Sequence, residues 1–146
     1  VNRMKKNNIP VSLFSKDDMI NNSFLEDKLS SLGVDYIVLA GFLLKVPSKL
    51  ILLFPDKIIN LHPSLLPKYG GKGMYGNNIH GAVLRNKEEK SGISIHYVNN
   101  NYDEGGVIFQ KECKIDKNET LESLVEKIHL LEKESFPKVL EKIILK

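Results

Sequence analysis

Hydrophobic residues along the chain fall into two patterns, short continuous runs and repeats at helical spacing. The runs predict strands buried in a sheet. These strands are predicted at residues 9–14, 34–40, 57–61, 93–98 and 106–115. The repeats, with apolar residues three and four positions apart, predict helices with one buried face. These helices are predicted at residues 21–32, 48–54, 77–87 and from 120 onward. The alternation predicts an α/β fold with a mostly parallel sheet and flanking helices.

Turn-forming residues mark the ends of several elements. Gly33 follows the first predicted helix, in the position that favours a left-handed cap. Pro47 precedes a short helix that Pro55 ends, because proline suits the start of a helix and cannot continue one. Pro137 lies inside the last helix and predicts a kink or a break. The segment 34–40 is so apolar that we expect both faces of its strand to be buried.

The composition is that of an ordinary globular protein and excludes several classes. The 146 residues are 42% hydrophobic and 27% charged, enough for a single domain, predicted to span residues 1–146. The longest apolar run, residues 36–44, is too short to cross a bilayer. Lys and Arg are scattered and the net charge is only +3, so we expect neither a nucleic-acid partner nor a membrane. A single cysteine, Cys113, excludes an internal disulfide and fits a reducing cytoplasm.

Candidate functional side chains follow the predicted strands. Asn60 and His62 stand at the carboxyl end of one strand. Gly41 and Phe42 follow the strand before it, and Asp103 follows the next one. Because ligands of α/β proteins bind beyond the carboxyl ends of strands, we expect these residues to converge on one rim of the sheet. Their spacing of two lets Asn60 and His62 point to the same side.

An amide, an imidazole and a carboxylate together suit the attack of an amine on a carbonyl carbon. Asn60 can stabilise the oxyanion, His62 can donate to it or move a proton, and Asp103 can favour the imidazolium form of His62. Ser64 lacks the surroundings of an activated nucleophile, so direct attack is indicated. The four histidines and the cysteine lack the spacing of metal ligands, so no metal site is predicted. Spacing alone leaves a purely structural interpretation of His62 and Asp103 open.

Three blocks of sequence closely resemble the phosphoribosylglycinamide formyltransferases, a family of folate-dependent enzymes. The blocks are residues 38–42, residues 60–69, and residues 92–98 followed by 103–105. They keep the family's order and spacing, and the resemblance extends over essentially the whole chain. Pro63 favours this family over relatives that act on methionyl-tRNA or nucleotide sugars, which usually carry a small residue there. The resemblance implies a Rossmann-like formyltransferase fold and an enzyme of purine biosynthesis.

The resemblance also implies a reaction and a set of site residues. A formyl group would pass from 10-formyltetrahydrofolate to the amine of glycinamide ribonucleotide, with no metal. Catalysis is assigned to Asn60, His62 and Asp103. The folate site is assigned to Phe42, Leu43, Val46, Asn60, Asn99 and Asp103. Contacts to the ribonucleotide are assigned to Gly41, Pro63 and Glu132, and shaping of the site to Ser94 and His96.

Three features depart from the family's pattern. The first is His129, which stands where the family commonly has a Gln that contacts the substrate. Residues 70–76 hold four glycines and form a longer link than usual, which predicts a mobile lid or a backbone that approaches a ligand. Lys72 is not followed by Ser or Thr, so this loop is not a P-loop. The family opens with a strand, a glycine-rich phosphate-binding turn and a helix, whereas the resemblance here begins inside the second helix. We therefore expect the N-terminal part of the domain to be missing from this chain.

Other functions stay open at this point. A deformylase would pass the formyl group to water, and another formyltransferase would use a different amine. A chain without the phosphate-binding turn could also be a non-catalytic folate-binding remnant. The oligomeric state is left open between a monomer and a homodimer.

Overall fold

The computed structural model describes residues 2–20 and 23–145, which form two compact units divided between Val34 and Asp35. The first unit contains α1 (Asn2–Lys6), α2 (Lys16–Ile20) and α3 (Phe24–Ser31). The start of α2 is a reciprocal cap, in which Ser15 N donates to the Asp18 carboxylate and Asp18 N donates to Ser15 Oγ. After α3, Gly33 adopts a φ of +61° and its N–H donates to the Ser30 carbonyl, as its position predicts.

The strand predicted at residues 9–14 is wrong. This segment has an extended or irregular backbone without a strand partner among the described residues. Its apolar side chains are exposed, and Leu13 is 79% exposed. β-forming residues become a strand only when a neighbouring strand pairs with them, which local sequence does not specify. The predicted helix 21–32 is confirmed over α3, while residues 21 and 22 lie outside the described residues.

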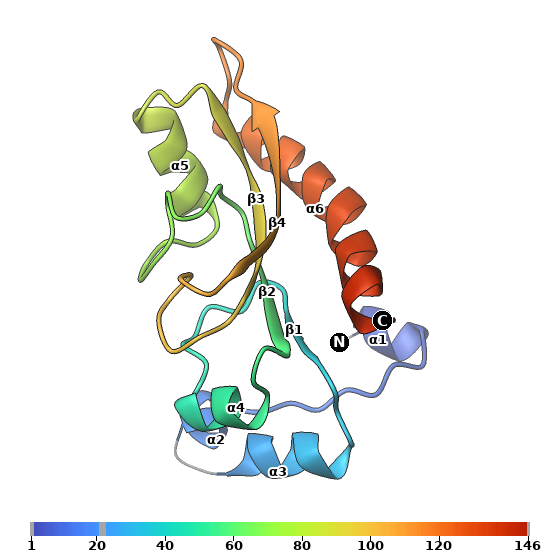
Figure 1. Ribbon diagram of the computed structural model, residues 1–146. Helices are drawn as coiled ribbons and strands as arrows, with labels where there is room; N and C mark the ends of the chain where they lie inside the picture. Colours follow the sequence, from blue (N-terminus) through green and yellow to red (C-terminus); the bar gives the residue numbers. More distant parts are fainter. Residues whose placement is uncertain (1, 21–22, 146) are drawn as a thin grey trace. The chain divides into compact units, whose positions relative to one another are not determined.

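The second unit contains, within the described residues, a four-stranded sheet in the order β1-β2-β3-β4 (Figure 1). Its strands are β1 (Ile37–Leu39), β2 (Ile58–His62), β3 (Lys90–Tyr97) and β4 (Val107–Lys114). β1 pairs parallel with β2, whereas β2–β3 and β3–β4 are antiparallel. The α/β class is confirmed, but the sheet is mixed rather than mostly parallel. β3 runs opposite to β2, because His62 at the end of β2 pairs with Ser94 and Ile59 near the start of β2 pairs with Tyr97 at the end of β3.

β1 is shorter and more exposed than the apolar run 34–40 predicts. It covers three residues, and Val38 is 39% exposed. Within the described residues β1 has a neighbouring strand on one side only, so it is an edge strand, and the prediction of a strand buried on both faces is wrong. The strand that is buried on both faces is β3, in which residues 91–96 are all buried.

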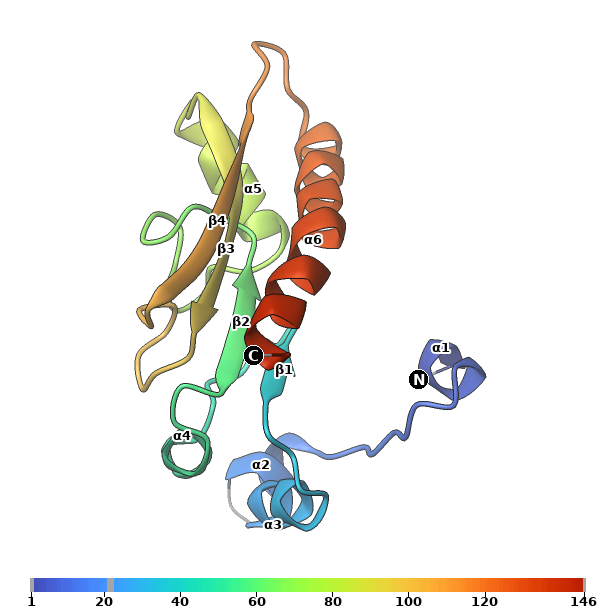
Figure 2. The ribbon, with the colours of Figure 1, turned by 45° about the vertical axis from the view of Figure 1, so that its right-hand side comes forward.

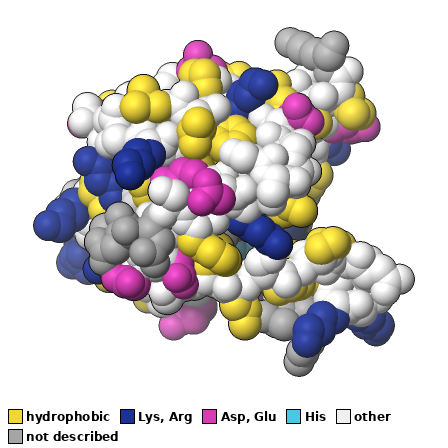
Figure 3. Space-filling model, turned by 90° about the horizontal axis from the view of Figure 1, so that it is seen from below, with side chains coloured by type: hydrophobic (Ala, Val, Ile, Leu, Met, Phe, Trp, Pro, Cys, Tyr) yellow, Lys and Arg dark blue, Asp and Glu magenta, His cyan; other side chains and the backbone are white. Residues whose placement is uncertain are grey.

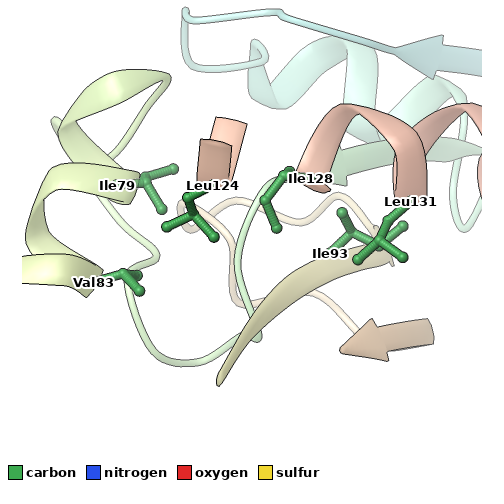
Figure 4. Packing of buried hydrophobic residues seen from close by; sticks show 6 residues of the cluster. All are labelled: Ile79, Val83, Ile93, Leu124, Ile128 and Leu131. Carbon is green, nitrogen blue, oxygen red and sulfur yellow. The ribbon is translucent and has the colours of Figure 1, made fainter. Parts of the chain in front are cut away.

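Three helices complete the second unit: α4 (Ser48–Leu53), α5 (Asn77–Arg85) and α6 (Leu121–Ile144). α6 lies along β3 and β4 and contacts α5 (Figures 1 and 2). Figure 4 shows the core between them, where apolar side chains of α5, β3 and α6 point toward one another. This core consists of Ile79, Val83, Ile93, Leu124, Ile128 and Leu131. The helical spacing in the sequence therefore identifies the buried faces of α5 and α6.

α6 runs without a break through Pro137. Thr120 caps its start, where its side chain accepts a hydrogen bond from Ser123 N. A proline inside a helix removes one backbone hydrogen bond and costs about 3 kcal/mol, and the packing of Leu124, Ile128 and Leu131 against the sheet holds the helix together despite it. The predicted break at Pro137 is wrong.

The surface is mixed in charge. On the face drawn in Figure 3, Lys and Arg side chains lie beside Asp and Glu side chains and between hydrophobic ones. Among the helices that the structure describes, none has both the length and the apolar character that crossing a membrane requires.

Candidate active site

A cavity of about 530 Å³ opens in the second unit where β1 ends. Leu39, the last residue of β1, pairs with Asn60, whereas β2 continues for two more residues to His62. Gly41 adopts a φ of +69° and the chain leaves the sheet there, so a notch forms beside the end of β2. The cavity occupies this notch, and its volume lies in the range of small-molecule sites.

Asn60 and His62 lie on the same face of β2, as their spacing predicts. They pair across the antiparallel ladder with His96 and Ser94, so these four polar side chains share one face of the sheet. The intervening residues Leu61, Ile93 and Ile95 face the other side, toward α5 and α6. The alternation of polar and apolar residues in β2 and β3 therefore separates the site from the core.

The imidazole of His62 is buried, with 4% of the residue exposed, and is held by a hydrogen bond at one nitrogen. Nε2 lies 2.9 Å from the Tyr69 carbonyl oxygen. Since a carbonyl only accepts hydrogen bonds, Nε2 carries the proton. Nδ1 then faces Asp103, whose Oδ1 lies 3.6 Å away.

His96 holds Asn60 in place. His96 Nδ1 lies 2.8 Å from the Tyr97 carbonyl, so Nδ1 carries the proton. Nε2 lies 3.1 Å from Asn60 Nδ2; in the neutral ring Nε2 is the acceptor and Asn60 the donor. Burial lowers the pKa of His96, although its bond to the Tyr97 carbonyl and the nearby Asp103 carboxylate act in the opposite direction. His96 is therefore neutral near pH 7 and leaves the second amide hydrogen of Asn60 free to point elsewhere.

Asp103 reaches the site through the loop that connects β3 to β4. β3 is antiparallel to β2, so its carboxyl end does not share the rim that the sequence predicts. The predicted convergence is correct, but the loop 98–106 produces it by returning toward β2. Asp103 Oδ2 accepts from Gly71 N at 2.8 Å. Gly105 lets the loop approach β3, because a Cβ atom there would lie 1.7 Å from the Tyr97 carbonyl oxygen.

The rest of the cavity wall is apolar on one side and glycine-rich on another. The predicted folate residues Phe42, Leu43, Val46 and Asn99 all line the cavity, as do Gly41 and Pro63. The loop 70–76 also contributes lining residues, namely Gly71, Gly73, Met74, Tyr75 and Gly76. Tyr69 adopts a φ of +58°, which presents its carbonyl to His62. The predicted mobility of this loop stays a prediction.

Ser94 lies away from the cavity and acts on the loop after β2. Its hydroxyl is fully buried, donates to the Ser64 carbonyl and accepts from Leu66 N. Gln110 Nε2 donates to the same hydroxyl and to the Leu66 carbonyl. Ser64 Oγ in turn donates to the Lys68 carbonyl. Ser94 therefore positions the backbone that follows His62, and its predicted role in shaping the site stays a prediction.

Two helices form a second polar wall. Glu132, which the sequence assigns to the ribonucleotide, lines the cavity together with His129 on α6 and His80 on α5. Burial raises the pKa of Glu132, while His129 acts in the opposite direction. Sequence reasoning assigned no role to His80. The pattern that could have identified His80 is a polar residue next to Ile79, on a helix whose buried face the sequence predicts.

A family model described as formyl transferase matches residues 1–140. The chain belongs to the formyl transferase family. The cavity thus lies in a formyl transferase chain, and Asn60, His62 and Asp103 are among the polar residues that line it.

Relatives and solved structures agree with this membership. The chloroplastic phosphoribosylglycinamide formyltransferase of Arabidopsis thaliana is 41% identical over 129 residues, 85% of this chain and 44% of that protein. The phosphoribosylglycinamide formyltransferase of Bacillus subtilis is 32% identical over 148 residues, 99% of this chain and 73% of that protein. The chain therefore spans less than half of the plant relative. A crystal structure of the same enzyme from Bacillus halodurans gives a TM-score of 0.87 at 29% identity, over 99% of this chain and 74% of that one.

These matches confirm the predicted resemblance and the predicted fold. In this formyl transferase chain, the cavity combines hydrogen-bond donors, a buried imidazole and a carboxylate with an apolar wall. Such a site can bind a flat, largely apolar ligand and polarise a carbonyl group of that ligand. The described residues contain no cluster of three or more His, Cys, Asp or Glu side chains that could hold a metal ion.

Proposed function

We propose that the protein transfers the formyl group of 10-formyltetrahydrofolate to the amine of glycinamide ribonucleotide, a step of de novo purine biosynthesis. The observation that carries this function is the convergence of Asn60, His62 and Asp103 on one cavity of a formyl transferase chain. The names of the relatives support the choice of amine. A cytoplasmic location goes with this function and suits a chain with one thiol.

The formyl donor fits the cavity by chemistry and size. Phe42, Leu43 and Val46 offer an apolar surface for a flat ring system, and the cavity of about 530 Å³ is large enough for a drug-sized ligand. Asn60 and His62 line the same cavity, so a formyl carbonyl placed beside them meets the free amide hydrogen of Asn60. The carboxylate of Asp103 lies on the same side.

The reaction is a direct transfer. The amine nitrogen bonds to the formyl carbon, the bond between that carbon and the folate nitrogen breaks, and the proton that the amine loses ends on the released folate nitrogen. Asn60 directs its second amide hydrogen to the formyl oxygen as negative charge develops. His62 supplies positive charge there when Nδ1 is protonated, and Asp103 stabilises that charge and accepts the amine's proton, directly or through water.

Ser64 does not offer a covalent alternative beside His62. Ser64 is the nearest hydroxyl in sequence to His62, but it is fully buried and its Oγ donates to the Lys68 carbonyl. A hydroxyl that is buried and donates to a carbonyl is not positioned to attack. This geometry supports direct attack by the substrate amine.

The test is a turnover assay on the complete protein, with and without glycinamide ribonucleotide. Release of tetrahydrofolate is expected only when the amine is present. His62→Ala and Asn60→Ala should each lower kcat by about 10²- to 10³-fold, the usual cost of removing an oxyanion donor. Asn118→Ala, an exposed turn residue before α6, is the matched control and should leave kcat unchanged.

Each alternative has its own result in this assay. Equal turnover in water alone would establish a deformylase instead. Turnover with methionyl-tRNA as acceptor, weakening steeply with salt, would establish another formyltransferase. Donor binding without turnover, unaffected by His62→Ala, would identify a non-catalytic remnant.

A further inference from the structure

His80 is a buried imidazole in the cavity wall to which the proposed chemistry gives no task. It lies in α5, is only 3% exposed and lines the cavity. Its Nδ1 atom is fully buried and has no hydrogen-bond partner among the described residues. Because Nδ1 is the enclosed nitrogen, the ring edge that borders the cavity is the opposite one, which carries Nε2.

The enclosure of Nδ1 determines the tautomer. A buried N–H without an acceptor is rarer and more costly than a bare lone pair. The neutral ring therefore carries its proton on Nε2, and Nδ1 is left as an unused acceptor. His80 thus presents an N–H donor toward the cavity.

The ring is also held neutral. Burial lowers the pKa of His80, and His129 and His62 lower it further because their positive charge repels a second one. The other titratable groups that line the cavity are Lys45, His62, Tyr75, His96, Tyr102, Asp103, His129 and Glu132. A neutral donor in this setting suits an uncharged oxygen, such as an amide carbonyl, better than a phosphate, which requires a cation or several N–H groups.

We propose that His80 is a specificity-determining residue that donates Nε2–H to the amide carbonyl oxygen beside the attacking amine of the substrate. The inference rests on the proposed function, because that function supplies an amine acceptor with an adjacent amide. His80 lines the same cavity as His62 at the reaction centre and as His129 and Glu132 on α6. An oxygen bound by His80 therefore belongs to the part of the substrate between the attacking nitrogen and the groups held by α6.

Three variants separate a hydrogen-bond donor from a simple filler of space. In His80→Gln, the amide Nε2 can replace the imidazole Nε2 as a donor at nearly the same distance. His80→Asn carries the same amide on a shorter side chain that cannot reach, and His80→Ala has no donor. Asn77→Ala, an exposed change in the same helix, is the matched control.

The kinetic test measures KM for the amine and for the folate donor separately in the complete protein. His80→Asn and His80→Ala should raise the amine KM about 5- to 10-fold, the range for losing one hydrogen bond, with kcat and the donor KM within about 2-fold. His80→Gln should stay within about 2-fold of the unaltered protein. With an acceptor in which a methylene replaces the amide carbonyl, the unaltered protein and the three His80 variants should have the same KM for the amine. Equal amine KM values for the natural acceptor, or equal losses for Gln and Ala, would overturn the role.

A spectroscopic test keeps this inference separate from the proposed function. Nitrogen-15 NMR of the histidine rings in the complete protein should show His80 as the Nε2–H tautomer at pH 7, and added glycinamide should shift that signal. If the protein transfers no formyl group but the shift occurs, the proposed function fails and the His80 site stands. An Nδ1–H tautomer, or no shift with glycinamide at saturating concentration, would show that His80 does not bind the amide, whether or not the protein transfers formyl groups.

Discussion

The two polar walls of the cavity differ in how fully the protein itself satisfies their polar groups. On the wall formed by the strands and their loops, His62 bonds to the Tyr69 carbonyl, Asn60 contacts His96, and Asp103 accepts from Gly71 N. On the wall formed by the helices, the buried Nδ1 of His80 has no hydrogen-bond partner among the described residues. The polar groups of the first wall are thus fixed by the protein, whereas the buried imidazole of the second wall is not.

This difference indicates that the strand wall promotes the reaction and that the helix wall recognises the substrate. Groups that must stabilise developing charge act best when they are fixed before the reaction, because no reorganisation is then needed. Groups that recognise a substrate gain most when the ligand supplies their missing partners, since an unpaired buried group disfavours the empty site and the wrong ligand. We therefore expect changes in the strand wall to affect kcat and changes in the helix wall to affect KM.

The largest effect is expected from Asp103→Asn. The amide has the shape of the carboxylate and can still accept from Gly71 N, but it neither supports a charged His62 nor accepts a proton. On the proposed chemistry, kcat should fall about 10³-fold with KM for both substrates within a few-fold. Asp35→Asn, an exposed change just before β1, should leave kcat unchanged. A rise in KM with kcat unchanged would contradict the expectation that the strand wall affects kcat and the helix wall affects KM.

An intermediate effect is expected from Gly105→Ala, which disturbs the strand wall without touching a polar group. The new Cβ would collide with the Tyr97 carbonyl, so the loop that carries Asp103 must move. We expect a loss of roughly 3 kcal/mol in unfolding free energy, measured by urea denaturation. The neighbouring change Gly106→Ala is the control, because its Cβ would meet only the Tyr97 ring, at 4.0 Å. Equal stability of the two variants would contradict the tight approach of the loop to β3.

The smallest effect is expected in the dependence of stability on pH, where the walls contribute with opposite sign. Burial lowers the pKa of His96. Below about pH 6.5 the unfolded chain therefore binds a proton that the folded chain does not, and stability falls as pH decreases. Burial raises the pKa of Glu132, so the folded chain keeps a proton that the unfolded chain loses above about pH 4.5, and stability falls as pH increases.

Urea denaturation at pH 5.5 and pH 7.5 checks these two signs. His96→Gln should reduce the gain in stability between the two pH values, and Glu132→Gln should increase it. Glu122→Gln, an exposed carboxyl on the same helix as Glu132, is the control and should change the gain less than either. A shift in the same direction for His96→Gln and Glu132→Gln would contradict the environments described for these residues.

The parts of the fold that the sequence predicts correctly depend on local periodicity. β2, β3, β4, α5 and α6 lie within a few residues of their predicted ranges, because apolar residues at a period of two or of 3.6 define one buried face. The strand at 9–14, the direction of β3 and the exposure of β1 could not be predicted in this way. Each depends on which strand lies beside which, and that is set by contacts distant in sequence.

The same limit applies to the site. Period two in β2 places Asn60 and His62 on one face, and the ladder with β3 adds His96. His80 escaped notice because its helix was recognised only by apolar residues such as its neighbour Ile79. Whether the polar neighbour of a buried apolar residue faces the cavity depends on where the notch beside β2 lies. A local sequence pattern does not reveal that position.

The size of the notch beside β2 can vary without a change in the reacting groups. The length of β1 relative to β2 determines how much space lies beside His62, whereas the reacting groups belong to β2 and to the loops anchored on β3. A longer or shorter β1 would change the room available for substrates while leaving the geometry of Asn60 and His62 as it is. Among chains of this fold, acceptors of different bulk could thus be accommodated by moving the point at which one edge strand stops.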